Sequence, residues 1–255
     1  LIFTDFHIGY EESLNKQGLM VPRFQFDEIM GRLGKIFSKL KGRKIDRIII
    51  NGDLKHEFGK ISDQEWRNTL KLIDYFSGYC DEIILIKGNH DKIVEPIAKK
   101  RNVRVMEHYL ISTIEKKTMK KDSIKKITIN NKIQKTIKHK IMNNKKMQQS
   151  LKKIKIINEN KPKNKILVMH GDKLPNKELL KNTKTIIIGH EHPAVSVREG
   201  PREELFKAFL VGKWKGKNLV VQPSFNLVTE GNDVLKEEVL SPLLKGNLKN
   251  FNAVI

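Results

Sequence analysis

The sequence predicts an α/β fold in which helices cover a central sheet. Five short runs of apolar, mostly β-branched residues recur along the chain, and patterns typical of amphipathic helices separate the first three runs. Continuous apolar runs of this length are typical of strands buried on both faces. Because strands and helices alternate, a central sheet covered by helices is the expected assembly.

Each predicted strand is followed at once by polar residues able to hold a metal ion. In chain order, Leu1–Thr4 precedes Asp5-Phe6-His7, Arg47–Ile50 precedes Asn51-Gly52-Asp53, Ile83–Ile86 precedes Lys87-Gly88-Asn89-His90-Asp91, Ile166–Met169 precedes His170-Gly171-Asp172, and Thr185–Ile188 precedes Gly189-His190-Glu191-His192. Because ligands of such sheets gather outside the carboxyl ends of the strands, we expect the five clusters to meet.

Two helices are predicted between the first three strands, and a different pattern follows the fifth. The apolar faces of the helices comprise Ile29, Met30, Leu33, Ile36, Phe37 and Leu40, and then Trp66, Leu70, Ile73 and Phe76. Strands are predicted at 194–197, 206–211 and 217–222, with turns at Gly200-Pro201 and Lys215-Gly216. These short strands predict an antiparallel portion, which could form a second sheet packed on the first.

Composition indicates a globular chain rather than a disordered or membrane-spanning one. The 255 residues are 38% hydrophobic, and the apolar runs are far shorter than the roughly 18 residues of a transmembrane helix. The single cysteine, Cys80, excludes an intramolecular disulfide and a cysteine-based zinc site, which fits a reducing cytosol and predicts a cytoplasmic protein. The sequence begins at Leu1, inside a predicted strand, so whether a further segment precedes Leu1 is an open question.

Most of the net charge of +21 lies in one lysine-rich segment. Residues 112–165 contain 18 lysines and three acidic residues, and we expect an insertion at about 114–162. One interpretation is that its lysines bind the phosphates of nucleic acid. The other is a solvated excursion whose Lys, Ile and Asn content reflects AT-rich codons. The segment lacks aromatic residues, which weakens the case for base stacking.

The polar clusters supply carboxylates, histidines and an asparagine, but no thiolate. This mixture suits Mn, Fe or Zn better than Ca. Seven candidate ligands exceed what one ion usually takes from protein, so two ions sharing a carboxylate fit the count. Paired ions about 3.5–4 Å apart are suited to the displacement of a phosphoryl group. Each cluster alone is as typical of an ordinary turn, but five in order after five strands favour a metal centre.

The motifs resemble those of the calcineurin-like metallophosphoesterases, from Asp5 to about Asp233 and interrupted by the lysine-rich segment. The stretches most similar to the ICC-like branch, which includes bacterial phosphoesterases associated with DNA ligase, are Asp5-Phe6-His7-Ile8-Gly9, Gly52-Asp53-Leu54-Lys55-His56-Glu57-Phe58, Gln222-Pro223-Ser224-Phe225-Asn226 and Gly231-Asn232-Asp233. The resemblance implies a four-layer α/β/β/α sandwich, and hence a single domain over 1–255 that carries the insertion.

The resemblance also implies a role for each candidate residue. It assigns the first metal to Asp5, His7 and His192, the bridging position to Asp53, and the second metal to Asn89, His170 and His190. Two divalent ions are implied, Mn first and Fe or Zn as alternatives. A hydroxide bridging them would attack phosphorus in line, and His90 would donate a proton to the leaving alkoxide.

His56 departs from the phosphatase pattern of this superfamily. Many family phosphatases have an aspartate three residues after the bridging one, whereas here that position is His56. Gly-Asp-Leu-x-His is instead similar to double-strand-break-repair nucleases, in which this histidine assists phosphodiester cleavage. A surface histidine is the alternative. Asp91 and Asp172 each follow predicted ligands, so they either anchor ligand loops or cap turns.

Three functions remain open at this point. The first is a two-metal phosphodiesterase or nuclease that acts on nucleic acid. The second is a phosphatase or phosphodiesterase for a small nucleotide, whose activity would be insensitive to salt. The third is a non-catalytic, basic adaptor that binds nucleic acid and keeps a vestigial or structural metal site. No membrane association is expected, and the sequence does not predict an oligomeric state.

Overall fold

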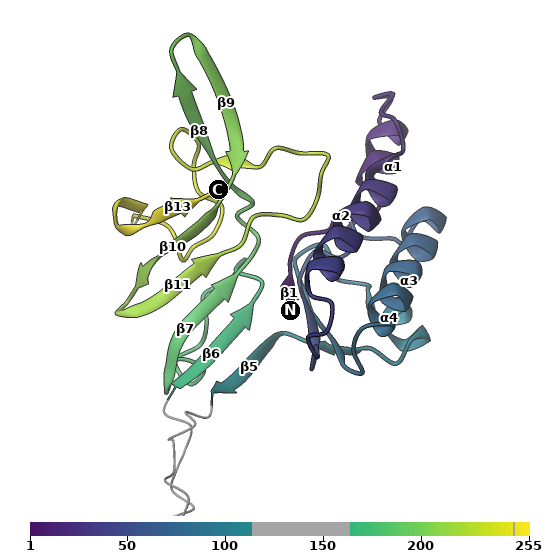
Figure 1. Ribbon diagram of the computed structural model, residues 1–255, viewed down its shortest axis with the longest axis horizontal. Coiled ribbons are helices and arrows are strands. Elements are labelled where there is room, and N and C mark those ends of the chain that lie inside the picture. Colours follow the sequence, from purple (N-terminus) through teal and green to yellow (C-terminus); the bar gives the residue numbers. More distant parts are fainter. Residues whose placement is uncertain (114–163, 247) are drawn as a thin grey trace, which may run out of the picture. The chain divides into compact units, whose positions relative to one another are not determined.

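The computed structural model describes residues 1–113, 164–246 and 248–255 of the chain (Figure 1). Leu1–Ile111 and Ile166–Ile255 together form one compact unit. The lysine-rich insertion predicted at about 114–162 lies outside the described residues, so the single-domain organisation stays a prediction.

The first sheet is parallel throughout, with strand order β1-β2-β3-β4. The strands are β1 (Ile2–Phe3), β2 (Ile48–Asn51), β3 (Ile83–Ile86) and β4 (Arg104–Met106). The helices of this part are α1 (Tyr10–Lys16), α2 (Gln25–Lys39), α3 (Asp63–Ser77) and α4 (Glu95–Lys100). The two predicted amphipathic helices are therefore confirmed as α2 and α3, and the short strand β4 and helices α1 and α4 are additions.

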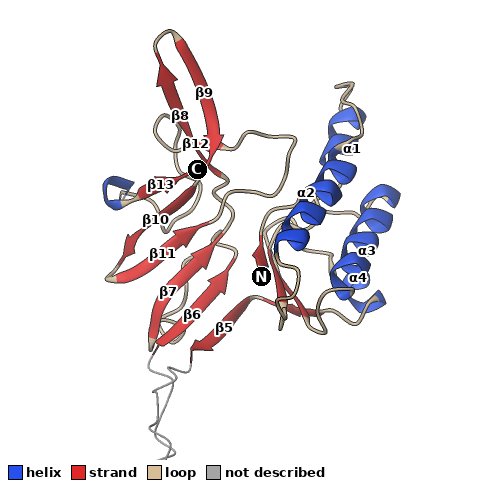
Figure 2. Ribbon diagram, in the orientation of Figure 1, coloured by secondary structure: helices blue, strands red, loops and turns tan. Residues whose placement is uncertain are grey.

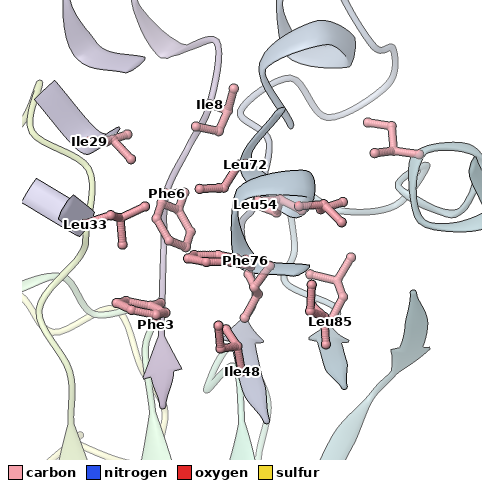
Figure 3. Packing of buried hydrophobic residues seen from close by; sticks show 14 of the residues in the cluster. Phe3, Phe6, Ile8, Ile29, Leu33, Ile48, Leu54, Leu72, Phe76 and Leu85 are labelled. Carbon is pink, nitrogen blue, oxygen red and sulfur yellow. The ribbon is translucent and has the colours of Figure 1, made fainter. Parts of the chain in front are cut away.

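The two faces of the first sheet are buried against different neighbours. Because side chains alternate along a strand, Ile48 and Ile50 of β2 face the core that contains Leu33 of α2 and Phe76 of α3 (Figure 3). Ile49 points the other way and packs in a cluster with Val168 of the second sheet. Burial on both faces explains why the strand is a continuous run of isoleucine.

The second sheet is mixed, with strand order β13-β10-β11-β7-β6-β5 (Figure 2). Its strands are β5 (His108–Thr113), β6 (Asn164–Met169), β7 (Thr183–Ile188), β10 (Phe209–Trp214), β11 (Lys217–Val221) and β13 (Asn252–Val254). The predicted strands at 166–169 and 185–188 are confirmed as β6 and β7. Strand β11 is parallel to β7 but antiparallel to β10, so the predicted antiparallel portion continues the sheet that carries two of the ligand clusters.

A third, small sheet contains β12 (Asn232–Asp233), β8 (Pro193–Glu199) and β9 (Arg202–Lys207). The sequence pattern predicts one strand over 206–211, and this is wrong. The run is divided at Ala208, whose backbone N–H donates to the Pro193 carbonyl at 3.0 Å, and the chain passes there from β9 to β10. The apolar run continues through Ala208 because that residue is itself fully buried, so hydropathy gives no signal of the break.

The predicted α/β class is confirmed, because helices pack against a parallel sheet and the chain also forms a mixed sheet. The core beyond the second sheet contains Trp214, Leu243, Leu244 and, partly buried, Phe251. Trp214 lies in β10, Leu243 and Leu244 lie in turns, and Phe251 directly follows a short 3-10 helix (Leu248–Asn250), so none of these four residues belongs to an α-helix. No helix in the described part of the chain is long and apolar enough to cross a lipid bilayer.

Candidate metal centre

The loops after five strands bring the predicted metal ligands together at one edge of the sheets. Parallel pairing continues past the ends of β1 and β2, because the Asp5 N–H donates to the Gly52 carbonyl at 3.1 Å and the His7 N–H donates to the Asp53 carbonyl at 2.9 Å. These bonds fix the first two ligand loops side by side. The other predicted ligands follow β3, β6 and β7, as the sequence predicts for a shared strand edge.

A first group of side chains able to hold a metal ion consists of Asp5, His7 and His192. The His192 Nε2 lies 3.4 Å from the Asp5 Oδ1, and the His7 Nε2 lies 3.3 Å from the His192 Nε2. Asp5 and His7 are buried, whereas His192 is partly exposed. The group therefore opens toward solvent on the His192 side.

A second group consists of Asp53, His170 and His190. The His170 Nε2 lies 3.2 Å from the Asp53 Oδ2 and 3.2 Å from the His190 Nδ1. The Asn89 Oδ1 lies 3.0 Å from the same His170 nitrogen, so this asparagine joins the group. Asp53 also connects the two groups, since its Oδ2 lies 3.7 Å from the His7 Nε2.

The donor set fits divalent cations. Asp5 Oδ1 is buried and has no hydrogen-bond partner among the described residues. Several ring nitrogens face each other or a carboxylate at 3.2–3.4 Å, an arrangement of lone pairs that a cation satisfies better than a proton does. Carboxylate oxygens and imidazoles suit Mn, Fe or Zn, while the described residues here contribute no thiolate.

Electrostatics keep both carboxylates charged and His7 and His190 neutral. Burial alone would raise the pKa of Asp53, but the hydrogen bond and charge of His170 hold it below its usual range. Burial opposes the charged form of His170, yet the Asp53 and Asp5 carboxylates outweigh it and raise its pKa to about 10. Burial lowers the pKa of His7 to about 3 and also lowers the pKa of His190, which leaves both free to coordinate.

The ligand loops have a strained backbone. The φ angles of Asp5, His7 and Asp53 are 53°, 47° and 46°, and those of His190 and His192 are 64° and 49°. Side-chain-bearing residues rarely adopt this left-handed region, and such strain concentrates at functional sites, where the surrounding contacts impose it. Five of the seven predicted ligands share this conformation. Contacts with surrounding residues, rather than local backbone preference, therefore impose the conformation of the ligand loops.

Three glycines allow the ligand loops to approach each other. A Cβ at Gly52 would overlap the His170 ring, one at Gly88 would overlap the Asp53 carboxylate, and one at Gly189 would overlap Thr4 and Asp5. Each of these glycines immediately precedes a predicted ligand. A glycine directly before a candidate ligand is therefore a usable signal in the sequence for loops that approach each other closely.

Buried hydrogen bonds hold the loops from behind. The carboxylate of Asp91 accepts from the N–H groups of Leu54 (3.2 Å), Lys55 (3.4 Å) and Gly88 (3.1 Å), so it ties the loop after β2 to the loop after β3. Asp91 therefore anchors ligand loops. Asp172 has a different environment, an ion pair at 3.6 Å with the neighbouring Lys173.

Gln25 was missed by sequence reasoning, and Asn226 was named only within a stretch similar to the family, without a role. The buried Gln25 amide donates to the His7 carbonyl at 3.3 Å and to the Asn226 Oδ1 at 3.0 Å. The Asn226 N–H donates to the Asp5 carbonyl at 2.9 Å. Together they support the Asp5–His7 loop, but 201 positions separate them and no motif spacing connects them.

His90 and His56 lie beside the first metal group. The His90 ring is 4.7 Å from the His7 ring, centroid to centroid, and its Nδ1 contacts the His56 carbonyl oxygen. This contact assigns the Nδ1 proton and leaves Nε2 free. The His56 Nδ1 is 3.4 Å from the His7 Nδ1, so His56 is part of the site rather than a remote surface residue. Burial, and then the nearby His90, lower the pKa of His56 to about 4.

Comparison with known proteins establishes the class of protein that this fold and site define. The family model for calcineurin-like phosphoesterases matches residues 1–210, so the chain belongs to that family. It is therefore a phosphate-ester hydrolase of a dinuclear, metal-dependent family, and its His/Asp groups are able to hold metal. No protein with a curated description matches the sequence.

Two solved structures show a distant likeness. The nuclease MPE of Pseudomonas putida is 14% identical, with 93% of this chain and 80% of that chain covered and a TM-score of 0.49. The protein of unknown function AQ665 from Aquifex aeolicus is 17% identical, with 74% and 76% covered and a TM-score of 0.36. Both TM-scores are low, so the family assignment rests on the family model alone.

The close approach between Gly88 and the Asp53 carboxylate leads to a specific prediction. Gly88→Ala would push the Asp53 carboxylate out of place, and we expect metal binding about 10- to 100-fold weaker, as for loss of a ligand-orienting group. Calorimetric titration of metal-free protein with Mn²⁺ measures this effect. The matched control is Gly31→Ala, because an added Cβ at Gly31 meets open space. Unchanged Mn²⁺ affinity in Gly88→Ala would contradict the proposed place of Asp53.

Proposed function

We propose that the protein is a two-metal phosphodiesterase that cleaves nucleic acid. The observation that supports this most is the convergence of two His/Asp groups joined through Asp53, with His90 and His56 beside the first group. Asp5, His7 and His192 would hold one ion, and Asn89, His170 and His190 the other, with Asp53 between them. When bound, a pair of divalent ions acidifies water near neutral pH and offsets charge on the phosphoryl oxygens.

The side chains around the ions have distinct tasks. The buried carboxylates of Asp5 and Asp53 provide the negative charge that retains cations. His170 must release its proton to serve as a ligand, so metal uptake is coupled to proton release. The backbone N–H of His90 donates to the Asp53 Oδ1 at 2.9 Å, which directs the other carboxylate oxygen, Oδ2, toward the histidines.

His90 is suited to hold the proton that the leaving group needs. Its Nδ1 is occupied by the His56 carbonyl, so a proton on Nε2 is directed away from that carbonyl and is available to a leaving alkoxide. His56 lies between His90 and Tyr10 and contacts His7 as well. We propose that His56 assists phosphodiester cleavage by orienting the group bound near His7.

The metal and cellular location are part of the same proposal. Mn suits the mixture of carboxylate, amide and imidazole ligands, with Fe or Zn as alternatives. A cytoplasmic location agrees with Cys80, which is buried and free.

A substrate panel tests the proposed activity. We expect the purified protein with Mn²⁺ to hydrolyse bis-p-nitrophenyl phosphate and end-labelled DNA or RNA, and to lose both activities in EDTA because the site depends on its cations. Elemental analysis of the same preparation identifies the resident metal. Activity confined to phosphomonoesters would contradict cleavage of nucleic acid and would favour the phosphatase hypothesis.

Replacement of His90 tests its role as proton donor. In His90→Ala we expect the rate on nucleic acid to fall about 100- to 10,000-fold, because an alkoxide leaves poorly without a proton. The rate on bis-p-nitrophenyl phosphate should fall much less, since nitrophenolate leaves unaided. Metal content should stay unchanged, because the bond to Asp53 comes from the His90 backbone. Equal losses on both substrates, or unchanged rates on both, would contradict proton donation, and a wild-type protein that hydrolyses neither substrate would favour a binding module.

We further propose that the lysine-rich segment contributes to nucleic-acid binding through its charge. Deletion of residues 116–160 should weaken DNA or RNA binding about tenfold or more at low salt and make affinity less dependent on salt. Hydrolysis of bis-p-nitrophenyl phosphate should be unaffected. A second variant of full length, with the lysines of 116–160 replaced by glutamine, separates charge from chain length. Unchanged affinity in both variants would contradict the binding role.

A further inference from the structure

Phe58 exposes an aromatic ring next to the site. The residue is 47% exposed, and its ring centroid lies 3.7 Å from that of His90 with 31° between the ring planes. One face of the ring is thus covered by the residue to which we assign proton donation. Nearly half of the residue stays exposed, where a phenylalanine gains little from folding.

The loop that carries Phe58 is anchored on both sides. The buried Glu65 carboxylate of α3 accepts from the backbone N–H groups of His56 at 3.0 Å and Glu57 at 2.8 Å. After Phe58, the Lys55 ammonium donates to the Lys60 carbonyl at 3.3 Å. An added Cβ at Gly59 would meet no atom within 4 Å, so the position after Phe58 borders open space. The ring is therefore presented on a supported loop with room beside it.

Phe58 is the outer member of a row of rings. Tyr10 stacks on His56 with centroids 4.1 Å apart and 21° between planes, and His56 lies 5.3 Å from His90. The row Tyr10, His56, His90 and Phe58, which we call the aromatic wall, flanks the first metal group. Its inner members are histidines with polar atoms, whereas Phe58 has only a flat apolar face.

We propose that Phe58 stacks against a nucleobase adjacent to the phosphate being cleaved, so that it selects substrates that carry bases. This stacking proposal rests on the proposed cleavage of nucleic acid. It adds a contact with the base, which the metal groups and the lysines do not provide. Metal ions and lysines bind phosphate, which every phosphoester has. A flat ring binds any base through its π-face with little sequence preference. The lysine-rich segment contains no aromatic residue, so Phe58 and the wall complement it.

Two oligomers of equal length and charge test the proposal. One is oligothymidylate, and the other has the same phosphodiester backbone without bases. We expect Phe58→Ala to raise KM for oligothymidylate about five- to twentyfold, the effect of one lost stacking contact, and to leave the abasic oligomer within about twofold. Phe58→Leu, which keeps apolar contact with His90 but lacks a ring, should behave like Phe58→Ala. Phe209→Ala, which removes a ring of similar exposure (42%) on β10, is the matched control.

The outcomes separate the proposal from the function on which it rests. Equal losses on the two oligomers would overturn base stacking and show that Phe58 acts only by packing on His90. Unchanged kinetics on both would overturn it as well. In either case the wild-type protein still cleaves nucleic acid, and the proposed function stands. A wild-type protein that cleaves neither oligomer, while hydrolysing small phosphoesters, would overturn the proposed function and the stacking proposal with it.

Discussion

The buried negative charge of Asp5 and Asp53 is the constraint on which the site depends. Removing a carboxylate from water costs several kcal/mol unless a partner compensates for it. His170 lies between the two, with Nε2 3.2 Å from the Asp53 Oδ2 and Nδ1 3.7 Å from the Asp5 Oδ1. Its proton supplies one positive charge for two negative ones, and Asp5 Oδ1 keeps no hydrogen bond among the described residues. Bound divalent cations would neutralise the remaining negative charge.

The packing of the two sheets explains why these charges meet. Ile48 and Ile50 face the helices, and Ile49 faces Val168, so a shift of β2 by one residue would place Arg47 or Asn51 at a position now filled by a buried isoleucine. A strand held on both faces ends at a defined place, and the polar residues after it are equally defined. The buried apolar strands therefore fix the positions of the candidate ligands, although no side chain of these apolar runs is itself a candidate ligand.

Much of the site could be predicted from the sequence because ligands such as Asp53 follow directly after their strands. Strand ends in parallel sheets share an edge, so order along the chain predicts proximity. The support of the site could not be predicted in this way. Gln25 lies at the start of a helix and Asn226 in a late loop, and only tertiary structure brings them together. The strained φ angles at Asp5 and His190 likewise contradict local preference and arise from long-range contacts.

Buried carboxylates that accept hydrogen bonds from backbone N–H groups recur in the structure. They explain how strained loops stay in place in a strongly basic chain. Besides Asp91, Glu11 accepts from Phe24 and Gln25 at 3.0 and 2.7 Å. Glu65 and Glu191 do the same, the latter for Leu240 and Ser241 at 2.9 and 2.7 Å.

Hydrogen bonds to a charged acceptor are roughly twice as strong as neutral ones, so one carboxylate replaces several bonds of regular secondary structure. Beyond the few backbone bonds that continue from β1 and β2, the ligand loops have no regular ladder, so such acceptors help to hold them. Burial nevertheless raises the pKa of Glu191, and burial with the charge of Asp53 raises the pKa of Asp91 to about 6. Cations in the site would offset that charge. Bound cations would therefore also stabilise the charged form of Asp91, and metal binding and loop order should support each other.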